Sequence, residues 1–184
     1  MATFNSAGSG NANADATWTE SGQPVAGSHV IIADGHTVTL TAHEAWGSVQ
    51  IATGGTLAGG GFTLTLNDGG THMFDAVGAI TGTLDILITG TTSRNIDFQS
   101  SSGYPRNLTI TPSSGTPVFS LWSAENNFSG DLTINGGTLS TSGSNYPLTV
   151  TGLIDVTTGG TITCNSSAVI TSSLAITGGT FTAP

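Results

Sequence analysis

Short runs in which apolar and polar residues alternate, each followed by a glycine turn, recur along this chain. The clearest run is Leu132-Thr133-Ile134-Asn135, which leads into Gly136-Gly137-Thr138-Leu139. Alternation at every second position predicts a β-strand with one buried face, and a Gly-Gly pair predicts a turn. Related runs, some close and some loose, occupy residues 49–57, 64–71, 84–86, 108–116, 154–162 and 174–181.

The spacing between these runs predicts the architecture. Successive runs begin at Leu84, Leu108, Leu132, Ile154 and Leu174. An interval of about 20–24 residues indicates stacked repeats, because one repeat cannot bury its apolar row alone and a stack of repeats can. We therefore predict an all-β fold, a parallel β-helix (β-solenoid) of about seven to eight rungs.

The N-terminal residues lack this periodicity. Residues 1–16 are small and polar apart from Phe4. This composition predicts an extended arm or a disordered tail, in which Phe4 either anchors the arm on a partner or lies in a floppy terminus. Residues 17–184 then form the β-helix domain. Trp18 is expected to plug the open end of the rod, because a solenoid must cover its first apolar layer.

Composition and charge narrow the classes of partner. Only 7% of the 184 residues are charged, lysine is absent, and the formal net charge is -9. Binding to nucleic acid or to an anionic membrane surface needs clusters of basic residues, so neither is expected. No apolar run approaches the length of a membrane span. The first residues lack the pattern of a signal peptide, so we expect synthesis in the cytoplasm.

The residues that could carry chemistry favour structural roles. Asp85, Asp131 and Asp155 occupy polar positions within strands, so a solvated outer face is favoured over the pair of facing carboxylates that glycoside hydrolysis needs. The single cysteine, Cys164, is expected in the core. No catalytic residue and no cofactor is predicted. The remaining carboxylates weighed as enzyme candidates are Asp75, Asp97 and Glu125.

Three histidines are spaced seven residues apart, at positions 29, 36 and 43. Metal binding requires ligands that converge on one point. An odd spacing within extended strands puts successive side chains on opposite faces, so the three imidazoles are not expected to converge. No metal site is predicted.

The first part of the predicted domain resembles a known group of proteins. The pattern begins with Trp18, Pro24 and Gly27, continues through residues 30–40, and ends in residues 49–57. It is similar to the opening of right-handed β-helix proteins of bacterial surfaces and phage virions. The resemblance covers residues 17–66 well and the remainder loosely. It implies a right-handed parallel β-helix that works on the outside of a cell or particle.

Three functions are compatible with this resemblance. The favoured expectation is a non-enzymatic virion structural protein, a capsid decoration or cement protein that forms a homotrimer, binds the major capsid protein and lies on the capsid exterior. The alternative is a tail fibre or spike that binds a cell-surface glycan, with Tyr104, Trp122 and Tyr146 as sugar platforms. The third is a polysaccharide-degrading enzyme, for which the scarcity of basic residues disfavours a lyase but not a hydrolase.

Candidate partner-contact residues are the aromatic and basic residues outside the regular strands. Insertions in solenoids collect on one face, which is often the contact face. Residues 98–106 are expected to form a protruding loop, with Tyr104 and Arg106 at its tip. The full set of expected contact residues is Phe4, Trp18, Tyr104, Arg106, Trp122 and Phe128.

Overall fold

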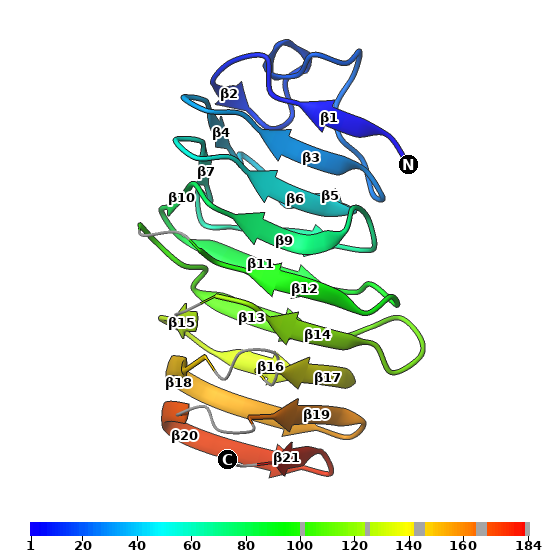
Figure 1. The fold of residues 1–184 in the computed structure, drawn as a ribbon, viewed down its shortest axis with the longest axis vertical. Coiled ribbons are helices and arrows are strands. Elements are labelled where there is room, and N and C mark those ends of the chain that lie inside the picture. The colour runs from blue at the N-terminus through cyan, green and yellow to red at the C-terminus, as the bar shows by residue number, and fades with distance from the viewer. Residues whose placement is uncertain (100–101, 124–125, 142–145, 165–168, 183–184) are drawn as a thin grey trace.

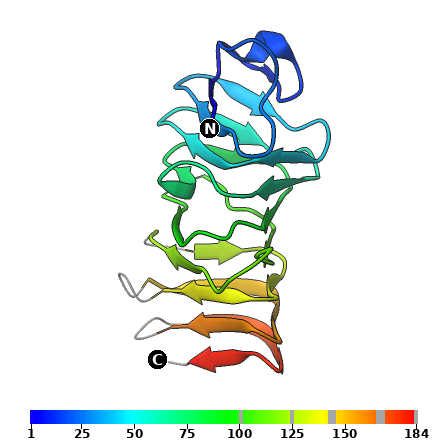
Figure 2. The ribbon, with the colours of Figure 1, turned by 90° about the vertical axis from the view of Figure 1, so that its right-hand side faces the viewer.

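The computed structural model is a parallel β-solenoid of about 8 turns, and it describes residues 1–99, 102–123, 126–141, 146–164 and 169–182 (Figure 1). Every pairing between named strands is parallel, and each strand pairs with the equivalent strand one turn away. The predicted all-β parallel β-helix is therefore confirmed. Turning the rod by 90° shows the turns stacked along one axis, with the N-terminal residues at one end and β21 at the other (Figure 2).

One wall of the solenoid is a nine-stranded sheet. Its strands run in chain order, and each belongs to a different turn. They are β1 (Thr3–Asn5), β3 (His29–Ile32), β6 (Ser48–Ile51), β9 (His72–Ala76), β12 (Arg94–Asp97), β14 (Val118–Leu121), β17 (Gly137–Ser140), β19 (Gly160–Thr163) and β21 (Thr180–Thr182).

Two further sheets complete the walls. A four-stranded sheet contains β2 (Gly10–Asn11), β4 (Thr37–Thr39), β7 (Thr56–Ala58) and β10 (Ala79–Thr81). An eight-stranded sheet contains β5 (Glu44–Trp46), β8 (Phe62–Leu66), β11 (Leu84–Ile88), β13 (Asn107–Ile110), β16 (Leu132–Ile134), β18 (Leu148–Thr157), β15 (Asn126–Phe128) and β20 (Val169–Thr177), which pairs with β18.

The core is a stack of aliphatic columns inside these walls. Leu108, Leu132 and Ile154 are direct register partners in three successive turns, and each side chain is fully buried. The polar residues between them face outward, as the alternation predicts. Burial of such a column removes apolar surface from water at about 25 cal/mol per Å², which makes it the main source of stability.

One predicted interval is wrong by two residues. The register partner of Leu108 is Ile86, not Leu84, and Ile86 in turn pairs with Leu64. The turn between Ile86 and Leu108 is thus shorter than the predicted one. Leu84, Ile86 and Ile88 are all inward-facing and buried. A shift of two residues keeps the same face of a strand inside, so the alternating pattern cannot distinguish the two registers.

In the glycine pair at positions 159 and 160, each position requires glycine for a different reason. Gly159 has a φ of 83°, a left-handed conformation that disfavours residues with a β-carbon. The next residue, Gly160, lies so close to the previous turn that a β-carbon would overlap the carbonyl oxygen of Ile134. A Gly-Gly pair therefore marks a tight corner where one turn presses on another.

The N-terminal residues form the first turn of the solenoid, which corrects the prediction of an extended arm over residues 1–16. Phe4 lies in β1, pairs with Val30, and is only 7% exposed. Ala12 follows β2 and is also buried. A short 3₁₀ helix, η1 (Asp15–Thr17), then leads to Trp18. Small residues fit this region because the first turn folds back tightly over the end of the core.

Trp18 closes the N-terminal end of the core, as predicted. Its ring makes edge-to-face contacts with Phe4 and Trp46, at centroid distances of 6.2 Å each. Its indole Nε1 donates a hydrogen bond to the carbonyl oxygen of Ala12 (2.9 Å). A buried indole with a satisfied N–H is a stable way to end an apolar column.

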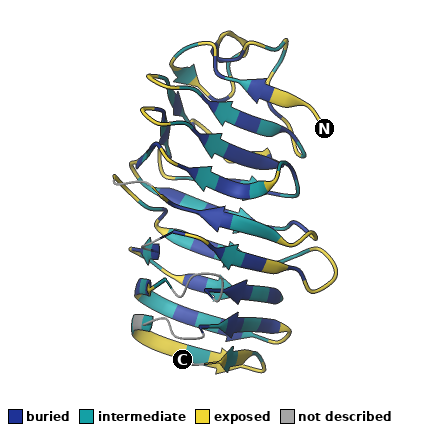
Figure 3. Cartoon of the chain, viewed as in Figure 1, coloured by how far each residue is buried: buried dark blue, intermediate teal, exposed yellow. Residues whose placement is uncertain are grey.

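The C-terminal end of the core is open within the residues that the structure describes. Leu174 and Ile176 of β20 are register partners of buried Ile154 and Val156, yet they are 45% and 48% exposed. The exposed last turn is visible as the yellow strand at the foot of the rod (Figure 3). Among the described residues, the N-terminal end of the core is therefore covered and the C-terminal end is not.

Candidate functional site

A ladder of polar side chains runs along the outer face of the nine-stranded sheet. Gln50 of β6, Asp75 of β9 and Asp97 of β12 are register partners in three successive turns. Gln50 Nε2 donates a hydrogen bond to Asp75 Oδ2 (3.3 Å). Parallel strands are spaced by about 4.8 Å, so Asp75 and Asp97 are neighbouring carboxylates. This is the arrangement of described residues that comes nearest to a catalytic pair.

The two carboxylates of this ladder have different surroundings. Asp97 is 5% exposed, and it accepts hydrogen bonds from Ser123 Oγ (2.9 Å) and Gln99 Nε2 (2.5 Å). Burial raises the pKa of Asp75, the negative charge of Asp97 raises it further, and His72, Gln50 and His29 oppose the rise. Asp75 is therefore more easily protonated than an ordinary aspartate.

Asp75 lines a small cavity. The cavity has a volume of about 50 Å³, and it is lined by His29, Val49, Gln50, Thr71, His72 and Asp75. Small-molecule sites have volumes of about 300–1,000 Å³, so this cavity can hold water-sized groups but not a sugar ring. Burial lowers the pKa of His29, while the charge of Asp75 opposes that effect. The local arrangement suits a hydrated polar patch on the sheet.

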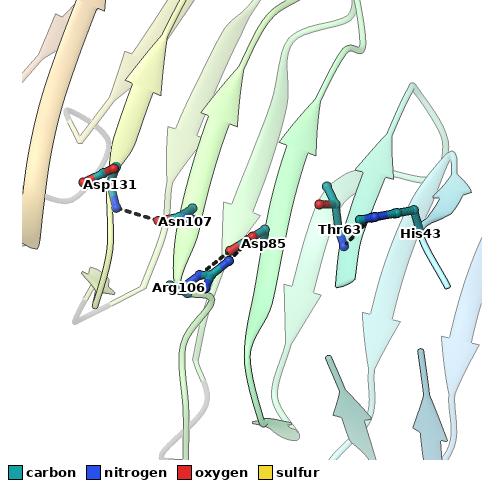
Figure 4. Close-up of polar contacts among 6 residues, drawn as sticks. All are labelled: His43, Thr63, Asp85, Arg106, Asn107 and Asp131. Carbon is teal, nitrogen blue, oxygen red and sulfur yellow. Dashed lines mark hydrogen bonds and ion pairs between the residues drawn. The ribbon is translucent and has the colours of Figure 1, made fainter. Parts of the chain in front are cut away.

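Two of the other candidate carboxylates, Asp85 and Asp131, form hydrogen bonds within the wall. Asp85 forms a bidentate ion pair with Arg106, with Nη2–Oδ2 and Nε–Oδ1 distances of 2.5 and 2.9 Å (Figure 4). Asp131 Oδ1 accepts a hydrogen bond from the Leu153 backbone N–H, 2.8 Å away. Asp155 faces outward in β18 and is half-buried. Glu125 lies outside the described residues.

The three histidines are held at separate corners of the solenoid. His29 Nδ1 lies 2.7 Å from Ser48 Oγ, and His36 Nδ1 lies 2.8 Å from Ser6 Oγ. His43 Nδ1 accepts a hydrogen bond from the backbone N–H of Thr63 (Figure 4). Among the described residues, no group of three or more His, Cys, Asp or Glu side chains is placed to hold a metal ion.

A larger groove lies on another side of the rod. It has a volume of about 410 Å³ and is lined by Tyr104, Asn127, Phe128, Ser129, Thr149 and Thr151. Asn127 of β15 is the register partner of Thr149 of β18, so two successive turns contribute to its floor. The groove has the size of a ligand site, and sequence reasoning selected only Tyr104 and Phe128 from its lining.

Three of the six expected contact residues are buried in the chain's own core. Phe4, Trp18 and Phe128 are at most 7% exposed, so their prediction as partner contacts is wrong. They occupy inward-facing positions, which their aromatic character also favours. Trp122 is 49% exposed and follows β14, so it remains available to a partner.

The predicted loop over residues 98–106 does not protrude where the structure describes it. Phe98 is buried, and Tyr104 is half-buried with its ring 6.5 Å from that of Phe98. Arg106 is exposed, but it lies beside the sheet in its ion pair with Asp85. Residues 100–101 lie outside the described residues. The aromatic residues of this segment thus fill the side of the rod.

Cys164 is fully buried, as predicted. Burial raises the pKa of its thiol, and a hydrogen bond with Thr141 opposes the rise. A thiol in this state is a core residue with little thiolate character.

Comparisons with known proteins do not assign the chain to a family. No protein-family model matches it, and no curated protein or solved structure does so either. In the described part of the chain, no helix has the length and apolar character needed to cross a membrane.

Proposed function

We propose that the chain is a non-enzymatic structural protein of a phage virion, a decoration or cement protein on the capsid exterior. The observation that carries this proposal is the open C-terminal end of the rod. The opposite end is covered by Phe4 and Trp18, so the two ends differ in kind. A rod with one covered and one uncovered end is suited to standing on a surface.

The uncovered end has the character of an assembly surface. Residues 169–182 contain no charged residue, and Leu174 and Ile176 expose apolar side chains there. β20 pairs only with β18 among the described strands, so its other edge has no strand partner there. An uncharged edge strand with exposed apolar side chains readily adds another strand. We propose a strand of the major capsid protein as its occupant.

This proposal puts attachment at the end of the rod opposite to the one where the expected N-terminal arm would contact a partner. The N-terminal residues are part of the folded first turn, so they are not available as an arm on the capsid. The C-terminal end would face the capsid, and the N-terminal end would project. The net charge of -9 supports dispersion of the particles through like-charge repulsion.

We propose a homotrimer as the assembled form. Three parallel rods around a threefold axis would bring three open ends onto one face, which suits attachment to a symmetric particle. The lateral contacts that we propose are Val118, the first residue of β14, and Trp122, which directly follows this strand; they are 39% and 49% exposed. Light scattering of the purified protein should give a mass near three times 18.3 kDa.

The capsid interaction is tested by charging the open end. In the Leu174→Glu/Ile176→Glu variant, carboxylates would have to enter the apolar contact, so binding to particles of the virus that encodes the chain should be lost in co-sedimentation. The matched control is Val25→Glu/Val77→Glu, which adds the same charge at apolar residues that are 64% and 44% exposed elsewhere. Full binding by the first variant would refute the proposed orientation.

A further inference from the structure

We infer that the groove beside Tyr104 is a binding site for a neutral saccharide. This site is independent of the open C-terminal end and of the proposed attachment to a capsid. The inference is carried by the position of the groove, the chemistry of its lining and the fixed orientation of its aromatic residues.

The groove lies at a break in one wall of the solenoid. The four-stranded sheet ends at β10, whose Ile80 N–H donates a hydrogen bond to the carbonyl oxygen of Ser102 in the next turn. The following strand on this side, β15, pairs with β18 and with no other described strand. β15 lies below β10 along the same edge of the rod (Figure 1). No described strand continues the ladder from β10 to β15, and the groove lies at this interruption.

The floor of the groove is a grid of small polar side chains. Asn127 and Ser129 follow one another on the outward face of one turn, and Thr149 and Thr151 do so on the next. Hydroxyl and amide groups both donate and accept hydrogen bonds, which matches the hydroxyl groups of a sugar. The separation of residues two apart on a strand, about 6.5 Å, is comparable to the width of a pyranose ring.

One wall of the groove is aromatic and held in place. The ring of Tyr104 packs against Phe98 at 6.5 Å, and Phe98 packs edge-to-face on Phe128 at 5.8 Å. This stack joins Tyr104 to the core, so little side-chain freedom is lost when a ligand contacts the ring. An aromatic face beside polar groups provides an apolar surface for the C–H face of a sugar.

The charge of the site selects among saccharides. Every described lining residue is uncharged, and the chain carries a net charge of -9. Arg106, two residues beyond Tyr104, is already in its ion pair with Asp85. An anionic sugar would therefore find no cation within the lining and would be repelled by the chain as a whole. A neutral oligosaccharide meets neither penalty.

The test is an NMR titration of the full chain with a panel of neutral oligosaccharides: maltotetraose, cellotetraose, galactotetraose and a mannotetraose. Tetragalacturonate serves as the anionic probe. We expect at least one neutral member to shift the amide signals of Asn127, Thr149 and Thr151 at concentrations up to about 10 mM, and the anionic probe to leave them unchanged.

Variants then test the placement of the site. Tyr104→Ala should weaken binding at least about tenfold, and Thr149→Val about threefold, because each removes one type of contact. Thr133→Val is the matched control, because Thr133 is also outward-facing and half-buried but lies on β16, away from the groove. The affinity of this variant for the oligosaccharide should be unchanged. Circular dichroism and the melting temperature of each variant report whether the fold is kept.

Three results would overturn the inference. They are the absence of binding by every neutral probe, binding that persists undiminished in both groove variants, and preferential binding of tetragalacturonate. Because these measurements need no capsid, they can fail while capsid binding through Leu174 and Ile176 stands, and the reverse also holds.

Discussion

Replacement of Trp18 by alanine should destabilise the N-terminal end of the rod by about 3–5 kcal/mol. Trp18 is 4% exposed, and substitution of a buried large aromatic residue by alanine costs this amount. The loss includes two edge-to-face contacts, which contribute about 0.5–1.5 kcal/mol each beyond their buried area. It also includes the hydrogen bond to Ala12, which contributes about 1 kcal/mol.

The assay is unfolding in urea, with tryptophan fluorescence as the probe. Trp46 lies directly beneath Trp18 and is fully buried, so a frayed first turn should expose Trp46 to water and shift its emission to the red before global unfolding. Early loss of one end is expected in a solenoid, since each repeat contacts only its neighbours. Trp18→Phe keeps the ring packing and should lose only about 1–2 kcal/mol.

Trp122→Ala is the control for the loss of an indole. Its side chain is 49% exposed, so in dilute solution its unfolding midpoint should stay within about 0.5 kcal/mol of the wild type. Equal stability of the Trp18→Ala variant and the wild type would refute the conclusion that residues 1–18 cover the core. Deletion of residues 1–16 is expected to expose Val30 and Ile32 and to cause aggregation.

Three further changes test the wall and the core. Asp75→Asn should raise the melting temperature at pH 7 but not at pH 3. Because the pKa of Asp75 is raised in the folded state, its ionisation lowers the stability of the folded state as pH rises through that pKa, and asparagine removes this loss. Asp155→Asn is the control variant. Burial raises the pKa of Asp68, but the hydrogen bonds from the backbone N–H groups of residues 91 and 92 outweigh burial and lower it. Asp68→Asn should therefore reduce stability at pH 7. In acid titrations, the stability of this variant should fall less steeply than that of the wild type below about pH 4. Ile134→Ala should cost about 2–5 kcal/mol in urea unfolding, whereas Thr133→Ala should change stability by about 0.5 kcal/mol or less.

The alternating runs predicted the fold because their pattern is local and strong. Leu132, Ile154 and Leu174, which begin three successive runs, are direct register partners, as the spacing of those runs implies. The pattern could not show which wall each run occupies. Val49 and Ile51 belong to the nine-stranded sheet, although their run resembles that of Leu132 in the eight-stranded sheet. Every corner of a solenoid uses the same turn chemistry, so similar runs can occupy different walls.

The candidate sites were harder to predict because they depend on contacts between turns. Asp75 and Asp97 are distant in the sequence and become neighbours only through the register of β9 and β12. The groove arises from an interrupted ladder, and Asn127 and Thr149 carry no local signal that distinguishes them from other outward polar residues. The small residues before Trp18 looked like a tail because burial of Ala12 needs the turn beneath it. The composition of residues 1–16 does not show that a neighbouring turn buries them.

The difference between the two ends of the rod also gives its folding a direction. A ribosome delivers the N-terminal residues first, at about 5–20 residues per second, so the first turn can close around Trp18 while later turns are still being made. Each new turn then finds a preformed edge and covers it within about a few seconds. The uncovered edge moves along with synthesis, which limits the time for which any completed turn is open to a neighbouring nascent chain.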